Sequence, residues 1–194
     1  MHAGKPGLRM LGIAESYRGR HDEGAISHLA GVVMRRDLRI DGFGTDEVTV
    51  GGNDATEAVV RLVQSVGRPD VRLVMLSGAV VAWFNVIDGA AVADETGCGV
   101  VSVTYEASPG LEDAIARHFP GDAARLAAYR RLGERTEVAL STGATVWLRS
   151  FGLDPADAAA LVDAFTLDGR VPEPVRAARL IARGLRCGRR SGSR

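Results

Sequence analysis

The feature that most constrains the fold is an apolar segment at residues 71–76, in which Arg72 is the single polar residue. A strand that is apolar on both sides is typical of a central parallel strand, buried on both faces of an α/β sheet. Ser77 and a glycine end the segment, and an aromatic-rich stretch with Asn85 and Asp88 follows. Open α/β sheets bind ligands beyond the carboxyl ends of their strands. The sequence therefore predicts a ligand site in this loop.

The other segments predict a mixed sheet covered by helices. We expect strands at residues 8–13, 26–34, 38–40, 48–50, 71–76, 99–105, 137–140 and 145–148, and helices at 54–66, 86–96, 111–118, 123–132, 155–165 and 174–185. Hairpin-connected strands followed by alternating strand–helix units give a ribonuclease H-like α/β order, with additional C-terminal helices. The 71–76 strand should lie centrally beside 8–13, with the 54–66 helix across the sheet.

Composition and charge set broad bounds on the chain. We expect a single domain at residues 5–185 and a basic Arg/Gly/Ser tail at 186–194, which is either solvated or in contact with phosphate. The formal net charge is +0, so no global field recruits nucleic acid. No signal peptide or membrane-length apolar run is evident, which favours a cytoplasmic protein with reduced thiols at Cys98 and Cys187 and no membrane partner.

Carboxylates are the candidate chemical groups. The sequence has no nucleophile elbow, no phosphate-binding P-loop and no zinc-ligand spacing. Glu15 ends the first predicted strand, Asp41 follows the third, Asp54 opens the first helix, and Asp88 lies in the loop after the central strand. If these strand ends converge, their oxygens would suit Mg²⁺ or Mn²⁺ and phosphodiester hydrolysis.

Three of these four acids could have a structural role in place of metal binding. Asp54 could cap its helix, with Glu57 completing a capping box, and Asp88 could cap the helix that follows it. Asp41 could belong to a turn. Glu15 follows a buried strand directly and has no obvious turn role.

Three segments carry a family resemblance. They are residues 11–16, residues 50–57 with a Gly-x-Asp-Ala-Thr motif, and residues 77–88 with a Phe-Asn-Val-x-Asp motif. Over about residues 5–183 the chain resembles the endonuclease dU family, an archaeal family related to endonuclease V. The resemblance implies a ribonuclease H-like fold and a DNA-repair endonuclease. Such an enzyme uses magnesium or manganese to nick DNA near deaminated bases such as deoxyuridine or deoxyinosine.

The match to this family is incomplete at two acidic positions. Family members carry two aspartates after the first strand, where this chain has Ala14 and Glu15, and a third aspartate where it has Ser77. Asp54, Asn85 and Asp88 match, because they belong to the shared motifs. Alanine has no ligand atom, and a serine hydroxyl is a weak neutral ligand for a hard cation. Either the acids that remain form an altered site, or this branch has lost cleavage.

The resemblance and the residues together give a set of candidate roles. As an endonuclease, the chain would use Glu15, Asp54 and Asp88 in catalysis, with Glu15 and Asp54 holding the metal ion. Trp83 and Phe84 would stack on an extruded base, although packing in the core is an equal alternative. The rival hypothesis is a non-catalytic protein of the same fold that binds nucleic acid or protein. The full set of expected substrate-binding residues is Ser16, Ser77, Gly78, Trp83, Phe84 and Asn85.

Overall fold

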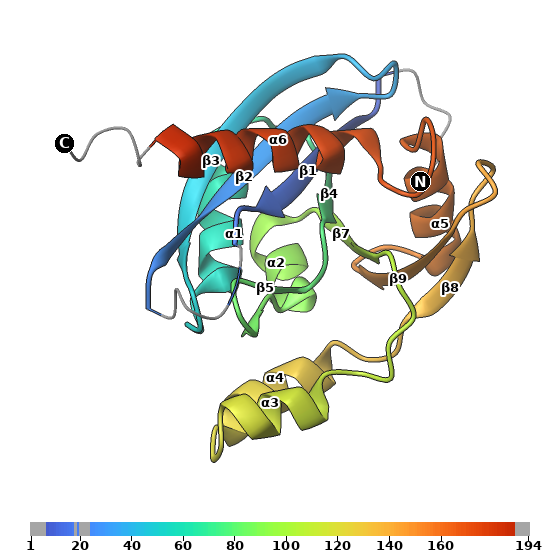
Figure 1. Cartoon of the computed structure of the whole chain (residues 1–194). Coiled ribbons are helices and arrows are strands. Elements are labelled where there is room, and N and C mark those ends of the chain that lie inside the picture. The colour runs from blue at the N-terminus through green and yellow to red at the C-terminus, as the bar shows by residue number, and fades with distance from the viewer. Residues whose placement is uncertain (1–6, 18, 20–23, 189–194) are drawn as a thin grey trace.

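The computed structural model describes residues 7–17, 19 and 24–188 (Figure 1). The strands of the main sheet are β1 (Arg9–Glu15), β2 (Ile26–Arg35), β3 (Ile40–Thr49), β4 (Leu73–Leu76), β7 (Gly99–Thr104), β8 (Thr136–Ala139) and β9 (Thr145–Phe151). Two short strands, β5 (Val80–Val81) and β6 (Asn85–Val86), pair separately. The helices are α1 (Ala55–Val66), α2 (Gly89–Thr96), α3 (Glu112–His118), α4 (Ala123–Arg131), α5 (Pro155–Ala164) and α6 (Glu173–Gly188).

The central position predicted for residues 71–76 is confirmed. In the described part of the chain the seven strands have the order β3-β2-β1-β4-β7-β9-β8. β4 runs parallel to both β1 and β7, while β2, β3, β8 and β9 pair with their neighbours antiparallel. All four residues of β4 are buried, as expected for a strand that is covered on both faces.

Helices cover both faces of the sheet, and the strand alternation divides the core between them. Leu11 and Ile13 of β1 pack with α1 residues such as Leu62, and α2 lies on this same face. Met10 of β1 instead belongs to a cluster that contains residues of α5 and the start of α6. Figure 1 shows α6 crossing β1 and β2 on one side of the sheet, with α1 and α2 on the other side. Successive β1 side chains therefore point to different helices.

The start of α6 lies very close to β1. A Cβ atom added to Gly12 would lie 2.4 Å from the carbonyl carbon of Pro174, so only glycine fits there. Farther along, Ala14 of β1 is buried against Ala178 of α6. Small residues thus let the helix backbone approach the strand, and this approach places the later turns of α6 over the carboxyl ends of β1 and β4.

Several element boundaries differ from the sequence prediction, most clearly those of β3 and α2. β3 is one continuous strand, whereas we expected separate strands at 38–40 and 48–50, with a turn or bend at Asp41. Pairing with the buried strand β2 continues through the Asp-Gly pair, but the register shifts between Val33 and Met34 and leaves Asp41 unpaired, so an irregularity stands where the bend was expected. The helix expected at 86–96 begins at Gly89, because the preceding residues pair with β5.

The C-terminal helix is longer than predicted. α6 ends at Gly188, so residues 186–188 of the expected basic tail are helical, while residues 189–194 lie outside the described residues. Arg186 donates a hydrogen bond to the Ser16 carbonyl oxygen, which holds this last turn against the end of β1. None of the helices in the described ranges has the length and apolar character needed to cross a membrane.

The close approach of α6 predicts opposite effects for two glycine substitutions. Gly12→Ala should destabilise the protein by about 1–3 kcal/mol, because the new methyl group overlaps Pro174. Gly184→Ala, in α6 with nothing within 4 Å of the added Cβ, should stabilise it by up to about 1 kcal/mol. Urea unfolding measures both free energies. Equal stability of the two variants would contradict the contact between α6 and β1.

Candidate functional site

The ends of β1 and β4 meet at one edge of the sheet, as the sequence predicts. The Ser77 backbone N–H donates to the Ile13 carbonyl oxygen at 2.9 Å, which continues the parallel pairing past β4. Ala14 and Glu15 therefore lie beside Ser77. This edge is where an open α/β sheet presents its ligand site.

Strand alternation separates Ala14 and Glu15, which stand where the resemblance implies two successive aspartates. Ala14 faces α6, where it packs against Ala178. Ser77 faces the same helix, since its hydroxyl accepts hydrogen bonds from Arg179. Glu15 points to the opposite face, toward Ser27 and the loop after β5. The carboxylate of Glu15 consequently does not replace an aspartate at position 14.

Glu15 has a structural role that the sequence did not reveal. One carboxylate oxygen accepts hydrogen bonds from the Tyr17 backbone N–H at 2.6 Å and from the Ser27 hydroxyl at 2.7 Å. The other oxygen accepts from the Ala82 backbone N–H at 3.4 Å. Glu15 therefore closes the turn at the end of β1 and ties it to β2 and to the loop that follows β5.

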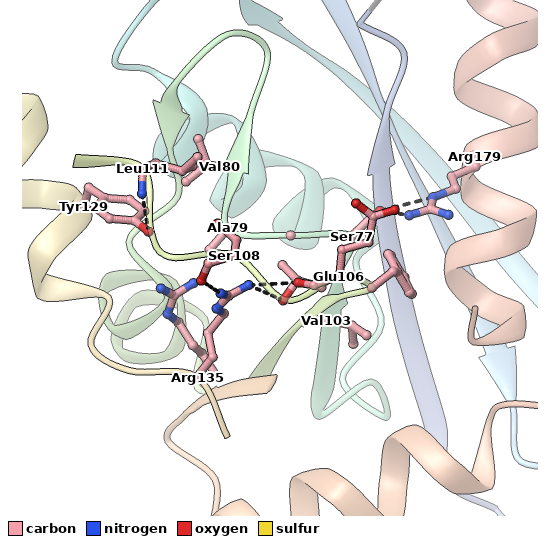
Figure 2. A pocket seen from close by; sticks show the side chains of 14 residues that line it. Ser77, Ala79, Val80, Val103, Glu106, Ser108, Leu111, Tyr129, Arg135 and Arg179 are labelled. Carbon is pink, nitrogen blue, oxygen red and sulfur yellow. Dashed lines mark hydrogen bonds between the residues drawn. The ribbon is translucent and has the colours of Figure 1, made fainter. Parts of the chain in front are cut away.

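A guanidinium group contacts Ser77, the residue that stands where the resemblance implies a third aspartate. Arg179 of α6 donates from Nε and Nη2 to the Ser77 hydroxyl oxygen, at 3.1 and 2.7 Å (Figure 2). The same guanidinium lies over the Tyr105 ring, 4.6 Å from its centroid. Sequence reasoning missed Arg179. The only signal was its membership of an arginine series at positions 179, 183 and 186, which recurs at helical spacing.

Asp54 does not cap α1 through its side chain, so the predicted cap and capping box are wrong. The carboxylate instead accepts from the Thr49 backbone N–H, from the Thr49 hydroxyl at 2.8 Å, and from the Asn85 amide at 2.7 Å. Asn85, which is fully buried, supplies the cap: its Oδ1 accepts from the Ala55 N–H at 3.0 Å. The cap comes from the β6 strand because Asp54 is turned toward β3.

These contacts determine the acidity of Asp54. Burial raises the pKa of the Asp54 carboxyl, but hydrogen bonds from Thr49 and Asn85 outweigh burial, and the pKa lies below its ordinary value of 3.8. Asp54 is therefore ionised at neutral pH and holds together the end of β3 and the start of α1.

Asp88 caps α2, which is the structural role that the sequence left open as an alternative to catalysis. Its Oδ1 atom accepts from the Ala90 and Ala91 backbone N–H groups at 3.1 and 3.2 Å, which caps α2. Its other oxygen lies 3.6 Å from Nε of Arg131. Asp88 thus stabilises the start of α2 and contacts α4.

Trp83 and Phe84 belong to an aromatic cluster with α3. The Trp83 ring centroid lies 4.8 Å from that of His118 and 4.9 Å from that of Phe84. Ala82, Trp83 and Phe84 are three consecutive residues with positive φ, at 38°, 62° and 60°. Such strain in residues other than glycine is retained only where surrounding contacts enforce it. In this structure Trp83 and Phe84 pack against neighbouring side chains, which agrees with the packing alternative.

Arg125 of α4 enforces this loop conformation, and sequence reasoning missed it. Its buried guanidinium donates to the Phe84 carbonyl at 2.7 Å and to the Gly51 and Gly52 carbonyls at 2.9 and 2.8 Å. It also pairs with Asp122 at 3.0 Å. A single cation therefore clamps two loops that are about thirty residues apart, and an alanine-rich helix gives no sequence signal for this.

Two pockets adjoin the strand ends. The strand-end pocket, of about 400 Å³, lies beside Ser77 and Gly78 (Figure 2). The arginine pocket, of about 420 Å³, lies between α6 and the end of β1 and includes Ser16. Arg179 lines both pockets. The strand-end pocket also contains Tyr105, Tyr129, Arg135 and Arg149, and the arginine pocket also contains Glu15, Tyr17, Arg183 and Arg186.

The residues at this edge do not fit the magnesium or manganese site that the resemblance implies. Within residues 7–17, 19 and 24–188, no group of three or more His, Cys, Asp or Glu side chains is arranged to hold a metal ion. Ala14 offers no ligand atom, and the Ser77 hydroxyl already contacts a cation. The oxygens of Glu15 and Asp54 accept the protein hydrogen bonds described above.

Comparison with known proteins identifies the family. Residues 6–186 match the family described as Endonuclease dU. The chain belongs to the endonuclease dU family. A UPF0215 protein of Pyrobaculum calidifontis is 41% identical over 177 residues, which cover 91% of this chain and 96% of the relative. A UPF0215 protein of Thermococcus kodakarensis is 32% identical, with 95% of each chain covered.

Solved structures confirm the ribonuclease H-like fold. A protein of unknown function from Archaeoglobus fulgidus has a TM-score of 0.77 at 29% identity, over 92% of this chain and 98% of that one. Human endonuclease V has a TM-score of 0.63 at 13% identity, over 94% and 86%. Ciona intestinalis endonuclease V, in complex with a 24mer DNA containing an inosine, has a TM-score of 0.62 at 14% identity, over 93% and 87%. Membership of the endonuclease dU family supports a nuclease, and the likeness to endonuclease V shows the shared fold.

The lowered pKa of Asp54 predicts a pH-dependent loss of stability on substitution. Asp54→Asn should reduce the free energy of unfolding at pH 7. The folded pKa lies below the unfolded one, so the charge stabilises fully above about pH 4, and this contribution is lost as pH falls through the folded pKa. The difference between variant and wild type should therefore shrink below about pH 4.

Urea unfolding between pH 2 and 7 measures this difference. Asp94→Asn, at an exposed position in α2, is the matched control and should follow the wild-type profile at every pH. A constant gap between Asp54→Asn and wild type across the whole range would show that the charge of Asp54 does not stabilise the fold.

Proposed function

We propose that this chain acts on DNA containing deaminated bases as an endonuclease-V-like protein in which recognition persists while phosphodiester hydrolysis is weakened. Membership of the endonuclease dU family supports nucleic acid as the ligand. Ala14 and Ser77, together with the cation at Ser77, support the weakened hydrolysis. The observation that carries the proposal is the donor-rich lining of the strand-end pocket.

The strand-end pocket has the hydrogen-bonding character that a deaminated base requires. Arg135, Arg149 and Arg179 all line it, and guanidinium groups donate hydrogen bonds but accept none. Deamination converts the amino group of cytosine or adenine into a carbonyl group, which is an acceptor. Donors at these positions favour the added carbonyl oxygen of uracil or hypoxanthine, while Glu106 in the same lining offers an acceptor.

Aromatic side chains and the pocket volume also suit a base. Tyr105 and Tyr129 contribute rings to the lining, and the volume of about 400 Å³ lies in the range of small-molecule sites. Burial raises the pKa of the Tyr105 hydroxyl, against the opposing charge of Arg179, so this hydroxyl stays protonated. A base in a duplex must be extruded to enter such a pocket, and a mismatched, deaminated base leaves the stack at lower cost.

Arg135 helps to shape the pocket wall. It donates from Nη2 to the Ser108 carbonyl at 2.6 Å and from Nη1 to the Glu106 carbonyl at 3.3 Å (Figure 2). These bonds hold the segment after β7 against the start of β8. The wall opposite Ser77 is therefore formed before any ligand binds, which lowers the entropic cost of binding.

The second candidate function is cleavage dependent on magnesium or manganese at an altered site that uses Glu15, Asp54 and Asp88. One observation favours it: the loops that carry the first two acids are connected. The Gly51 N–H donates to the Ala82 carbonyl at 2.7 Å, while the Ala82 N–H donates to Glu15. Cleavage assays separate the two candidates.

Binding and cleavage measured on the same oligonucleotides test the proposal. Wild-type protein should bind uracil- or hypoxanthine-containing DNA more tightly than the undamaged sequence, with little or no cleavage in magnesium or manganese. Fluorescence anisotropy gives the dissociation constants, and denaturing gels of end-labelled DNA give the cleavage. Efficient metal-dependent nicking would establish the second candidate instead, and equal affinity for damaged and undamaged DNA would contradict base recognition.

A single substitution tests the donor lining. Arg149→Met removes the donors while keeping a long side chain, and it should reduce the preference for uracil-containing over undamaged DNA about tenfold. Arg72→Met, an exposed position outside the strand-end pocket, is the control and should keep the wild-type preference. An unchanged preference in Arg149→Met would exclude this arginine from base recognition.

A further inference from the structure

Three arginines lie on one face of α6. Arg179, Arg183 and Arg186 are spaced at i, i+4 and i+7, which places them on the same side of the helix. All three line the arginine pocket, where α6 passes the end of β1. The pocket volume of about 420 Å³ is enough for a phosphate group with its attached sugars.

No carboxylate neutralises these three side chains within the described residues. Other arginines of the protein form ion pairs: Arg176, on the same helix, lies 2.8 Å from Asp168 and 3.1 Å from Glu173. The ion pairs of the described residues include none with Arg179, Arg183 or Arg186. Three positive charges therefore converge on one pocket and attract an anion.

Neighbouring groups hold two of the three arginines in place. Arg179 is oriented by the Ser77 hydroxyl, and Arg186 by the Ser16 carbonyl oxygen. Arg183 is exposed between them, one turn from each. Two of the guanidinium groups are thus ordered in advance, which reduces the entropy lost when an anion binds.

Glu15 also lines the arginine pocket but does not occupy the arginines. Its two carboxylate oxygens accept from the Tyr17 N–H, the Ser27 hydroxyl and the Ala82 N–H. Its charge is therefore satisfied on the α1 side of the sheet, and the guanidinium groups on the α6 side keep for a ligand the donors that Ser77 and Ser16 do not use.

We propose that Arg179, Arg183 and Arg186 form a metal-independent clamp for a backbone phosphate of nucleic acid. Guanidinium groups bind phosphate oxygens through paired, charge-assisted hydrogen bonds. Arg179 lines both pockets, so a phosphate in the arginine pocket lies next to the strand-end pocket. One nucleotide can then place its base in the strand-end pocket and its phosphate against α6. This inference rests on the proposed function for the nature of the ligand.

Anisotropy titrations in EDTA test the clamp. The probes are an undamaged single-stranded oligonucleotide and the same strand with one uracil, each at several salt concentrations. Wild-type protein should bind both without added metal. Arg183→Gln and Arg186→Gln should each weaken binding to both probes about tenfold. Each should also lower the slope of log affinity against log salt by about 0.7, the value for one lost phosphate contact on a single strand.

Arg176→Gln is the matched control, because it removes the same charge from the same helix at a position outside both pockets. It should bind as wild type does, and thermal melting confirms that each variant is folded. Arg183 has no partner to lose among the described residues, so its variant should melt as wild type.

The outcomes separate the clamp from the proposed function. Unchanged binding in both Arg183→Gln and Arg186→Gln, or wild-type binding that requires magnesium, would overturn the clamp. If wild type prefers the uracil strand in that case, the proposed function still stands. Conversely, a loss of binding in both variants without any wild-type preference for uracil supports the clamp and contradicts base recognition.

Discussion

The contact between Arg179 and Ser77 determines what the strand-end site can bind. Two hydrogen bonds join α6 to the residue after the central strand, across 102 positions of sequence. The contact depends on Gly12, which lets the start of α6 approach β1, and on Ala14, which packs against the same helix. In an endonuclease family, positions 14 and 77 are expected to carry acids. Here position 14 carries a methyl group that packs against Ala178, and position 77 carries a hydroxyl that accepts hydrogen bonds from Arg179.

This arrangement changes the charge at the strand ends from negative to positive. A site of converging carboxylates attracts a divalent cation, which in turn binds phosphate. Permanent guanidinium charge binds phosphate directly and supplies no metal-bound nucleophile. Under the proposed function, the protein keeps an affinity for nucleic acid while it carries fewer groups that could hold a metal ion. The acids that remain, Glu15, Asp54 and Asp88, each accept hydrogen bonds that hold loops and helix ends in place.

Sequence reasoning predicted the parts of the structure that depend on local pattern. The apolar run at residues 71–76 placed β4 at the centre, and the order of elements gave the ribonuclease H-like sheet. The alternative role of Asp88 as a cap was also correct, because its partners lie two and three residues away. These features follow from periodicity and from turn and cap chemistry.

Features that depend on distant contacts were not predictable in the same way. The cap of α1 comes from Asn85, thirty positions after the residue it caps, so the local signal at Asp54 pointed to the wrong side chain. The clamp by Arg125 and the cation at Ser77 depend on how α4 and α6 lie on the sheet. The alternation of side chains along a strand could have shown from the sequence that Ala14 and Glu15 point to opposite faces of the sheet.

The most direct test of the cation at Ser77 is the manganese affinity of two variants measured by calorimetry. The first carries Ala14→Asp and Ser77→Asp, and the second adds Arg179→Ala. If Arg179 occupies the metal position, its guanidinium should pair with the new aspartate in the first variant, so only the second variant should gain tight manganese binding. Equally tight binding by both variants would contradict the account.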